Sequence, residues 1–138
     1  MTVSDDATIN DQDLLYRRIH PKQLAEDIDG SPRLSSAAFK PNQQDELTLS
    51  AYLLTALAQI PANPSDCALP GAGHTLAELG VGDVRCLGLG VVRDPVTRAE
   101  VPNPCDPAHA LITGFIATRK AVERQARALA AQARWPCV

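Results

Sequence analysis

The clearest pattern of apolar and polar positions lies near the C-terminus. Apolar residues recur there at i, i+4, i+7 and i+11, the spacing that places side chains on one face of an α-helix. They are Val122, Ala126, Leu129 and Ala133. The spacing predicts a long helix from about Thr118 to Trp135.

A short apolar run before this helix predicts a buried strand, Ala108–Ile112, led by His109. Three prolines between residues 101 and 107 stiffen the loop that enters the strand, and Gly114 ends it. We expect this loop, strand and helix to form the unit on which the rest of the domain packs.

A second strand is predicted at Val84–Val92, which is rich in apolar residues. Gly88 and Gly90 lie two positions apart and would therefore share one face of an extended chain. A strand face without side chains allows another element to approach closely. We expect the proline-rich loop or Phe115 to pack there.

Two shorter helices are predicted before these segments. Ser50 has the side chain of a helix N-cap, and the apolar positions after it predict a helix over Ala51–Ile60. Thr75 and Glu78 have the spacing of a capping box, which predicts a short helix at Leu76–Leu79.

The first third of the chain carries weaker signals. Leu14–Ile19 fits either a strand or the first turns of a helix, because the run is too short for periodicity to decide. Lys22–Ile28 fits one helical turn, and Arg33–Lys40 fits an extended segment of small residues and serines. Residues 1–13 are acidic and without period, so we expect a flexible tail there.

Together these elements predict a small α+β domain over residues 14–138. We expect a short mixed or antiparallel sheet that packs on the long C-terminal helix and on one medium helix. A chain of 138 residues fits one domain. It can bury a core that folds without a metal or a disulfide.

Charge limits the classes of partner. A net charge of −3 argues against general affinity for nucleic acid, which needs a concentrated excess of Lys and Arg. Nevertheless, nine of the 16 acidic residues lie in the first 46 positions, whereas the last 22 positions are basic. Aromatic residues that could stack on bases do not accompany these cations. The predicted terminal helix carries a basic stripe that fits a protein partner: Lys120, Arg124, Arg127 and Arg134.

The chain shows no signal-peptide pattern and no apolar run of the roughly 18 residues that a membrane span needs. We therefore expect a cytoplasmic protein without a membrane partner. In that compartment Cys67, Cys86, Cys105 and Cys137 are expected to stay reduced and to pack as small apolar side chains.

A zinc site is the alternative role for the thiols. Cys67 with His74, and Cys105 with His109, give two Cys/His pairs that could supply tetrahedral ligands. Their Cys-x6-His and Cys-x3-His spacings differ from the tight cysteine pairs of zinc ribbons and fingers. We therefore expect no metal and no other cofactor.

His109 is the strongest catalytic candidate, because the predicted strand and loop hold its ring in a defined orientation. Candidate nucleophiles are Ser35, Ser36 and Cys105, and candidate orienting carboxylates are Asp94 and Asp106. No nucleophile elbow and no pair of carboxylates accompanies the histidine. We therefore favour a structural role, in which His109 donates one ring hydrogen to a loop carbonyl.

Three segments together resemble a family of small uncharacterised bacterial proteins: Leu15–Pro21, Ser35–Phe39 and Asp106–Gly114. That family has an Arg-Arg-Ile-Pro-Pro-like start, a Pro-Ser-Ser-Ala-Ala-Phe-like middle and a Pro-Ala-His-Ala-like end before a basic helix. Here His20 replaces the first proline, and Leu34 replaces the proline that usually follows Arg33. The resemblance implies a bacterial, cytosolic, single-domain component of a multi-gene system, such as a defence or toxin system. It implies no established activity.

From the sequence we expect a non-enzymatic interaction module that binds another protein through the proline-rich loop and the terminal helix. The alternative is a small hydrolase or transferase that uses His109 as acid or base, with Ser36 or Cys105 nearby.

Overall fold

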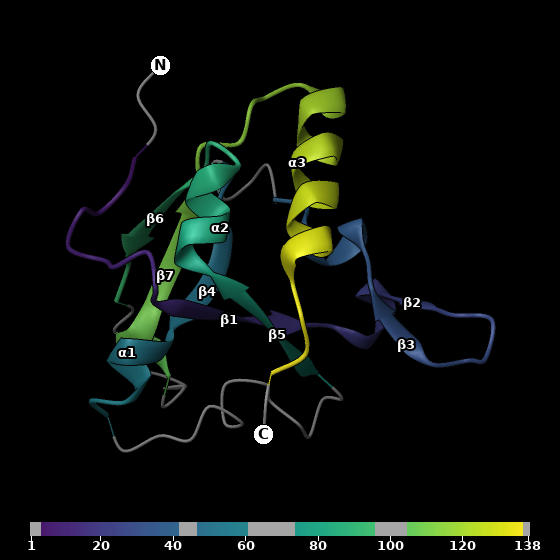
Figure 1. Ribbon diagram of the computed structural model, residues 1–138, viewed down its shortest axis with the longest axis horizontal. Helices are drawn as coiled ribbons and strands as arrows, with labels where there is room; N and C mark the ends of the chain where they lie inside the picture. Colours follow the sequence, from purple (N-terminus) through teal and green to yellow (C-terminus); the bar gives the residue numbers. More distant parts are fainter. Residues whose placement is uncertain (1–3, 42–46, 61–73, 96–104, 137–138) are drawn as a thin grey trace, which may run out of the picture.

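The computed structural model describes residues 4–41, 47–60, 74–95 and 105–136. Its centre is a five-stranded sheet of order β5-β1-β4-β7-β6, in which every neighbouring pair is antiparallel (Figure 1). These observations confirm the predicted α+β class and the single small domain. The strands are β1 (Leu14–Ile19), β4 (Leu49–Leu53), β5 (Thr75–Gly80), β6 (Gly90–Arg93) and β7 (His109–Thr113).

Different elements cover the two faces of the sheet. Helices α2 (Val81–Cys86) and α3 (Arg119–Gln132) and the 3-10 helix η2 (Ser36–Phe39) cover one face, which we call the helical face (Figure 1). The other face, which we call the second face, packs on α1 (Leu54–Leu57) and on the 3-10 helix η6 (Asp106–Ala108).

Strand β1 shows how one segment serves both faces. Leu15 and Ile19 are buried in the core of the helical face, whereas Tyr16 belongs to the cluster on the second face. Because side chains of a strand alternate between faces, Arg18 lies on the second face with Tyr16. The strand, rather than the helix, forms here because both alternating sets of side chains find a covered face.

The two strongest sequence predictions are confirmed. Strand β7 begins at His109, and α3 follows Thr118, whose side-chain oxygen accepts a hydrogen bond from the Ala121 N–H (3.2 Å). The helix buries Ala126 and Leu129 of the predicted apolar face. It ends at Gln132, slightly before the predicted end.

The helix predicted at Leu76–Leu79 is wrong, because these residues lie in β5. The strand pairs with β1 along its whole length, from Leu14 opposite Gly80 to Ile19 opposite Thr75. A capping box is a local signal, and pairing along a complete neighbouring strand outweighs it.

Two further predictions are wrong in part. The helix expected over Ala51–Ile60 is mostly strand β4, and only α1 is helical. The strand expected over Val84–Val92 is helix α2 in its first part and β6 in its last. Gly88 lies in the turn between them, with a φ of 81° that favours glycine. It therefore does not share a strand face with Gly90.

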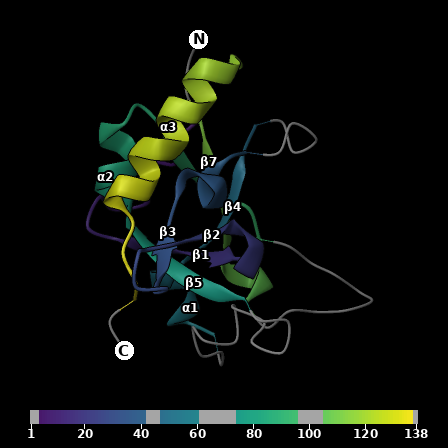
Figure 2. The same ribbon diagram turned by 90° about the vertical axis from the view of Figure 1, so that its right-hand side faces the viewer.

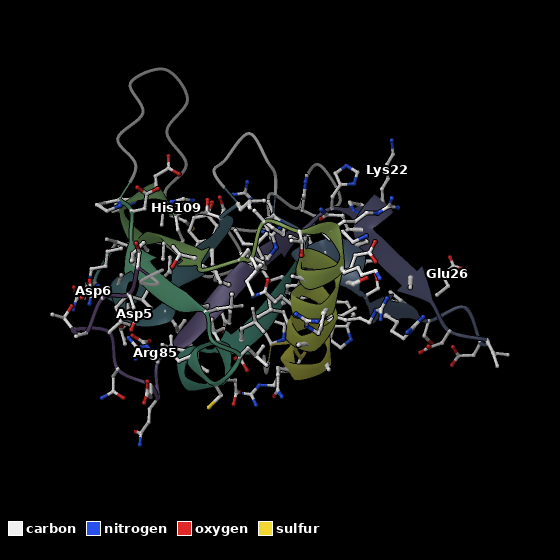
Figure 3. The ribbon with its side chains drawn as sticks, turned by 90° about the horizontal axis from the view of Figure 1, so that it is seen from above. Asp5, Asp6, Lys22, Glu26, Arg85 and His109 are labelled. Atoms are coloured by element: carbon white, nitrogen blue, oxygen red, sulfur yellow. The ribbon has the colours of Figure 1, made fainter. Side chains whose placement is uncertain are left out.

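Residues 4–13 pack against the domain and do not form the flexible tail expected over residues 1–13. Ile9 is only 1% exposed and belongs to the main core. Arg85 of α2 donates to the carboxylates of Asp5 (3.2 Å) and Asp11 (2.6 Å) and to the Asp6 carbonyl (2.9 Å). Figure 3 shows Asp5, Asp6 and Arg85 gathered on one side of the molecule. We call residues 4–13 the N-terminal strap.

Both edges of the five-stranded sheet are capped. At β6, the Asp6 N–H donates to the Val91 carbonyl (2.8 Å), and the Asp5 carboxylate accepts from the Val91 N–H (2.9 Å). At β5, Glu78 and Arg134 exchange two backbone hydrogen bonds of 2.8 and 3.1 Å. Unpaired strand edges are templates for aggregation, so both caps protect the sheet.

A two-stranded arm, β2 (Leu24–Glu26) and β3 (Pro32–Leu34), projects from the domain (Figures 1 and 2). The helical turn predicted at Lys22–Ile28 is confined to the 3-10 turn η1 (Pro21–Gln23) before it. Leu24 and Leu34 face each other across the arm and pack against the core, which anchors its base.

Candidate functional site

A cleft of about 280 Å³ opens where β1, β4 and η1 meet the start of β5. Strand β1 and the turn after it supply most of the polar groups, because alternate residues of β1 reach the second face and η1 turns the chain back over it. The described residues that line the cleft are Arg17, Arg18, His20, Gln23, Ser50, Tyr52 and His74.

Arg18 and Tyr52 form one wall. The Arg18 guanidinium donates to the Tyr52 hydroxyl (2.8 Å), and its central carbon lies 5.6 Å from the centroid of the Tyr52 ring. A cation over an aromatic face is attracted by the electron-rich ring. The two contacts together hold the guanidinium in one orientation at the cleft.

Arg17 also borders the cleft, but its side chain extends to the helical face, because neighbouring residues of a strand face opposite sides. Its Nε donates to the Ala38 carbonyl (2.6 Å) and its Nη1 to the Ser50 carbonyl (2.8 Å). Burial lowers the pKa of Arg17 to about 10, which still leaves the group charged at neutral pH. Its acceptors among the described residues are neutral carbonyls, so its positive charge is not cancelled by an adjacent carboxylate.

His20 and His74 close the cleft. Their rings meet edge to face, with centroids 5.0 Å apart. The His20 Nδ1 accepts from the Lys22 N–H (3.0 Å), and the His20 N–H donates to the Gln23 side chain (2.8 Å). These capping bonds fix the His20 ring, and in its neutral form they place the ring hydrogen on Nε2.

The His74 Nδ1 is buried and makes no hydrogen bond to any part of the chain that the structure describes. Desolvation, followed by the positive charges of His20 and Arg18, holds the pKa of His74 below its usual value of 6.5. A buried polar atom without a partner costs free energy. A ligand that accepted a hydrogen bond there would remove that cost.

The charge of the cleft is one-sided. Its described lining holds two arginines and two histidines and no aspartate or glutamate, although the whole chain carries a net charge of −3. A concave surface with cations of one sign concentrates positive potential. Guanidinium groups and imidazoles are the usual partners of phosphate and carboxylate oxygens, so the arrangement suits an anion.

His109 lies beside this cleft and does not line it. Its Nδ1 is 3.0 Å from the Asp94 carbonyl and 3.1 Å from the Asp94 carboxylate, and its ring meets Tyr52 edge to face at 5.7 Å. The loop-carbonyl contact expected of His109 is therefore present, and Asp94 supplies both oxygens.

The other catalytic candidates are not grouped with His109. Ser36 lies in η2 on the helical face of the sheet, away from His109. Cys105 is buried in a disulfide, so it offers no thiolate. Asp106 is buried at the start of η6, and the carboxylate beside the His109 ring is instead that of Asp94.

The cysteine predictions need correction. Cys105 is disulfide-bonded rather than reduced, and Cys86 is an exposed free thiol at the end of α2 rather than a mid-strand residue. Cys67 and Cys137 lie outside the described residues. Within the described ranges no three His, Cys, Asp or Glu side chains are grouped to hold a metal ion. His74 and His109 contact different partners.

The predicted basic stripe loses one member. Lys120, Arg124 and Arg127 are exposed on α3. Arg134 lies beyond the end of the helix, where its side chain bonds to the buried carboxylate of Glu78. The partner face expected on α3 is thus limited to three cations.

Sequence reasoning missed the cleft. A signal was present, because Arg18 and His20 are two residues apart and would share one face of a strand. His74 could not be placed with them, because that requires the register of β5 on β1. Comparison with protein-family models, with curated proteins and with solved structures finds no match to this chain. No helix in the described part is long and apolar enough to cross a membrane.

Proposed function

We propose that the protein is a non-catalytic binding module that takes an anionic group, a phosphate or a carboxylate of its partner, into the cleft. The observation that carries the proposal is the buried His74 Nδ1 without a partner, in a cleft that the Arg18 guanidinium and the His20 ring also line. An oxyanion is the ligand that satisfies all of these groups together.

The cleft favours binding over catalysis. Arg17 is fixed by two carbonyls, Arg18 by Tyr52, and His20 by its capping bonds. Fixed donors lose little conformational freedom when a ligand arrives. No carboxylate in the described lining could orient either cleft histidine as a general base.

The partner proposed from the sequence remains a protein. An acidic or phosphorylated segment would bring its oxyanion to the cleft, and the exposed cations of α3 add attraction at longer range. The resemblance to components of multi-gene bacterial systems makes proteins encoded by neighbouring genes the first partners to test.

The first test titrates inorganic phosphate and acetate into the full chain and follows the imidazole signals of His20, His74 and His109 by NMR. Phosphate should shift the signals of His20 and His74 far more than that of His109. The shifts should saturate with a dissociation constant on the order of 1 mM, as expected for a single small charged ligand. Arg18→Gln should weaken binding at least tenfold. Arg124→Gln, which removes an exposed cation of α3, is the matched control.

Two outcomes contradict the proposal. One is the absence of any saturable shift at His74. The other is an equal loss of affinity in Arg18→Gln and Arg124→Gln, which would assign the effect to overall charge. A response to phosphate but not acetate would identify the phosphorylated source.

The same site predicts a pH dependence. Because the free His74 has a lowered pKa, it is mostly neutral near pH 7, and an adjacent anion would raise that pKa. Binding should therefore take up a proton. The affinity for sulfate, whose charge is constant in this range, should increase as pH falls from about 7 toward the lowered pKa. His74→Gln should flatten this dependence. An affinity that does not change with pH in wild type would contradict a role for His74.

A second candidate function is acid–base chemistry at His109. The observation that favours it is the 3.1 Å contact between the His109 Nδ1 and the Asp94 carboxylate, the arrangement that orients catalytic histidines. The candidate nucleophiles Ser36 and Cys105 do not contact the His109 ring in the described part of the chain. It is tested together with the structural role of His109 below.

A further inference from the structure

The tip of the β2–β3 arm is an ordered apolar knob with an acidic collar. Ile28 at the tip is fully exposed, and the neighbouring Asp27 and Asp29 are exposed as well. Asp27 forms an ion pair with Arg33 (3.1 Å), which offsets part of the acidic charge of the collar. The turn is fixed by the bond from the Gly30 N–H to the Asp27 carbonyl (2.9 Å) and by the bond from the Ser31 N–H to the Asp29 carboxylate (2.9 Å). These bonds present Ile28 in one position.

A single exposed apolar residue is common on protein surfaces. Ile28 differs because of where it lies: the arm carries it away from the domain, and Figure 3 shows Glu26 on the same projecting segment. The side chain contributes nothing to the base of the arm, which Leu24 and Leu34 anchor. Its position suits a contact with a second molecule.

A groove of about 580 Å³ lies at the first turn of α3. Its apolar wall consists of Leu47, Ala117 and Val122. The cations Lys40 and Arg119 flank it together with Glu123, so the charge at its rim is positive by one. Both cations are exposed. Arg119 has only a long contact of 3.9 Å with Glu123, so most of its charge is available to a partner.

We propose that the tip of the arm of one copy of this chain inserts into the groove of a second copy. Ile28 would fill the apolar part beside Leu47 and Val122. The carboxylates of Asp27 and Asp29 would face Lys40 and Arg119. The chain thus carries both an acidic apolar knob and a basic apolar hole, which is the complementarity that protein contacts use.

The contact joins different surfaces of the two copies. Figures 1 and 2 show the arm beyond the C-terminal end of α3, whereas the groove lies at the opposite end, near Arg119. A knob therefore does not meet the groove of its own molecule. Each copy can give a knob to one neighbour and accept one from another, so the association runs head to tail.

The contact is small, so its affinity is low. One side chain in a groove buries far less than the roughly 1,600 Å² of a standard protein interface. We expect a dissociation constant on the order of 100 µM to 1 mM. Because charged side chains lie at its rim on both copies, the association should weaken as salt is raised from about 50 to 500 mM.

Sedimentation velocity from about 10 µM to 1 mM tests the proposal with two exposed-site variants of the full chain. Ile28→Asp removes the knob, and Ala117→Glu places a negative charge in the groove. Wild type should show a mass that rises with concentration, whereas each variant alone should stay monomeric. An equimolar mixture retains one intact knob and one intact groove, and it should form dimers and nothing longer.

Ile116→Ser is the control, because Ile116 is exposed beside the groove but does not line it, and it should associate like wild type. The proposal is wrong if wild type is monomeric at 1 mM. It is also wrong if wild type associates but the mixture does not form dimers, since that result indicates contact between like surfaces. These outcomes are independent of phosphate binding at the cleft.

Discussion

At the scale of single residues, Tyr52 connects the cleft to His109. It lies opposite Tyr16 on one neighbouring strand and opposite His109 on the other. Its hydroxyl accepts from Arg18, while its ring meets the His109 ring. The two contacts together restrict the Tyr52 side chain to the position in which its hydroxyl reaches Arg18 and its ring reaches His109.

The first residue-scale prediction concerns His109→Ala. The substitution removes the hydrogen bond to Asp94 and the ring contact with Tyr52, and it should destabilise the fold by about 1–3 kcal/mol. Differential scanning calorimetry should show a decrease in Tm of roughly 4 °C per kcal/mol. The backbone bond from the Asp94 N–H to the His109 carbonyl (2.9 Å) remains in the variant.

The same variant separates the two roles of His109. If Tm is unchanged and the biological activity is abolished, the structural role is wrong and the acid–base role gains support. If Tm decreases and phosphate still shifts His74 in folded protein, His109 acts by positioning the β6–β7 end of the sheet.

Much of the site lay beyond single-sequence reasoning for a geometric reason. The position of His109 at the start of a strand could be predicted, because Ala108–Ile112 is a short apolar run after a proline-rich loop. The contact of Arg18 with Tyr52 joins residues that are more than thirty positions apart in the sequence. The contact of His20 with His74 joins residues more than fifty positions apart. Neither spacing follows from local patterns.

At the scale of elements, α3 was predictable because its apolar positions are periodic, and β7 because its short apolar run follows a proline-rich loop. The failures at β4, β5 and α2 have a shared cause. Their segments are short, so periodicity separates strand from helix poorly. Pairing with β1 and β7 then decides which element forms.

The N-terminal strap is the element whose attachment is easiest to test. Arg85→Ala removes three hydrogen bonds to the strap and should cost about 1 kcal/mol, since the partly exposed ion pairs are screened by solvent. Hydrogen exchange should show faster exchange of the Asp6 and Ile9 amides than in wild type.

Arg93→Ala provides the matched control for Arg85→Ala. Arg93 makes a single exposed contact of 3.5 Å with Asp6, and its loss should leave the exchange of the strap close to wild type. Equal effects of the two variants would show that charge, rather than the clamp geometry of Arg85, attaches the strap.

At the scale of the whole molecule, the two terminal segments cover both edges of the five-stranded sheet. In the part of the chain that the structure describes, they do not cover the two-stranded β2–β3 arm. The partner surfaces proposed above, the cleft, α3 and the arm, all lie away from the capped edges. The capped edges therefore stabilise the domain, and the binding roles that we propose belong to the cleft, α3 and the arm.

The cap at β5 predicts a change in solubility. Arg134→Pro removes the N–H that donates to the Glu78 carbonyl, and Ala133 already has the extended ψ of 151° that a following proline favours. The β5 edge should open, and static light scattering should show aggregation on mild heating well below the wild-type temperature.

Arg134→Ala keeps the backbone donor and removes the side-chain bond to Glu78, so comparison with Arg134→Pro tests the backbone cap. It should lower stability because Glu78, 7% exposed at its side chain, loses a charged partner. It should aggregate less than Arg134→Pro. The reverse order would show that the ion pair, and not the backbone cap, protects the edge.

The two caps also set an order of events during synthesis. The strap that covers β6 leaves the ribosome before β6 itself, so that edge can be covered as soon as Val91 emerges. The edge of β5 must wait for Arg134, long after Gly80 has been made. For that interval the nascent chain carries an open strand edge, and translation that stalls between these points would release the most aggregation-prone form of the protein.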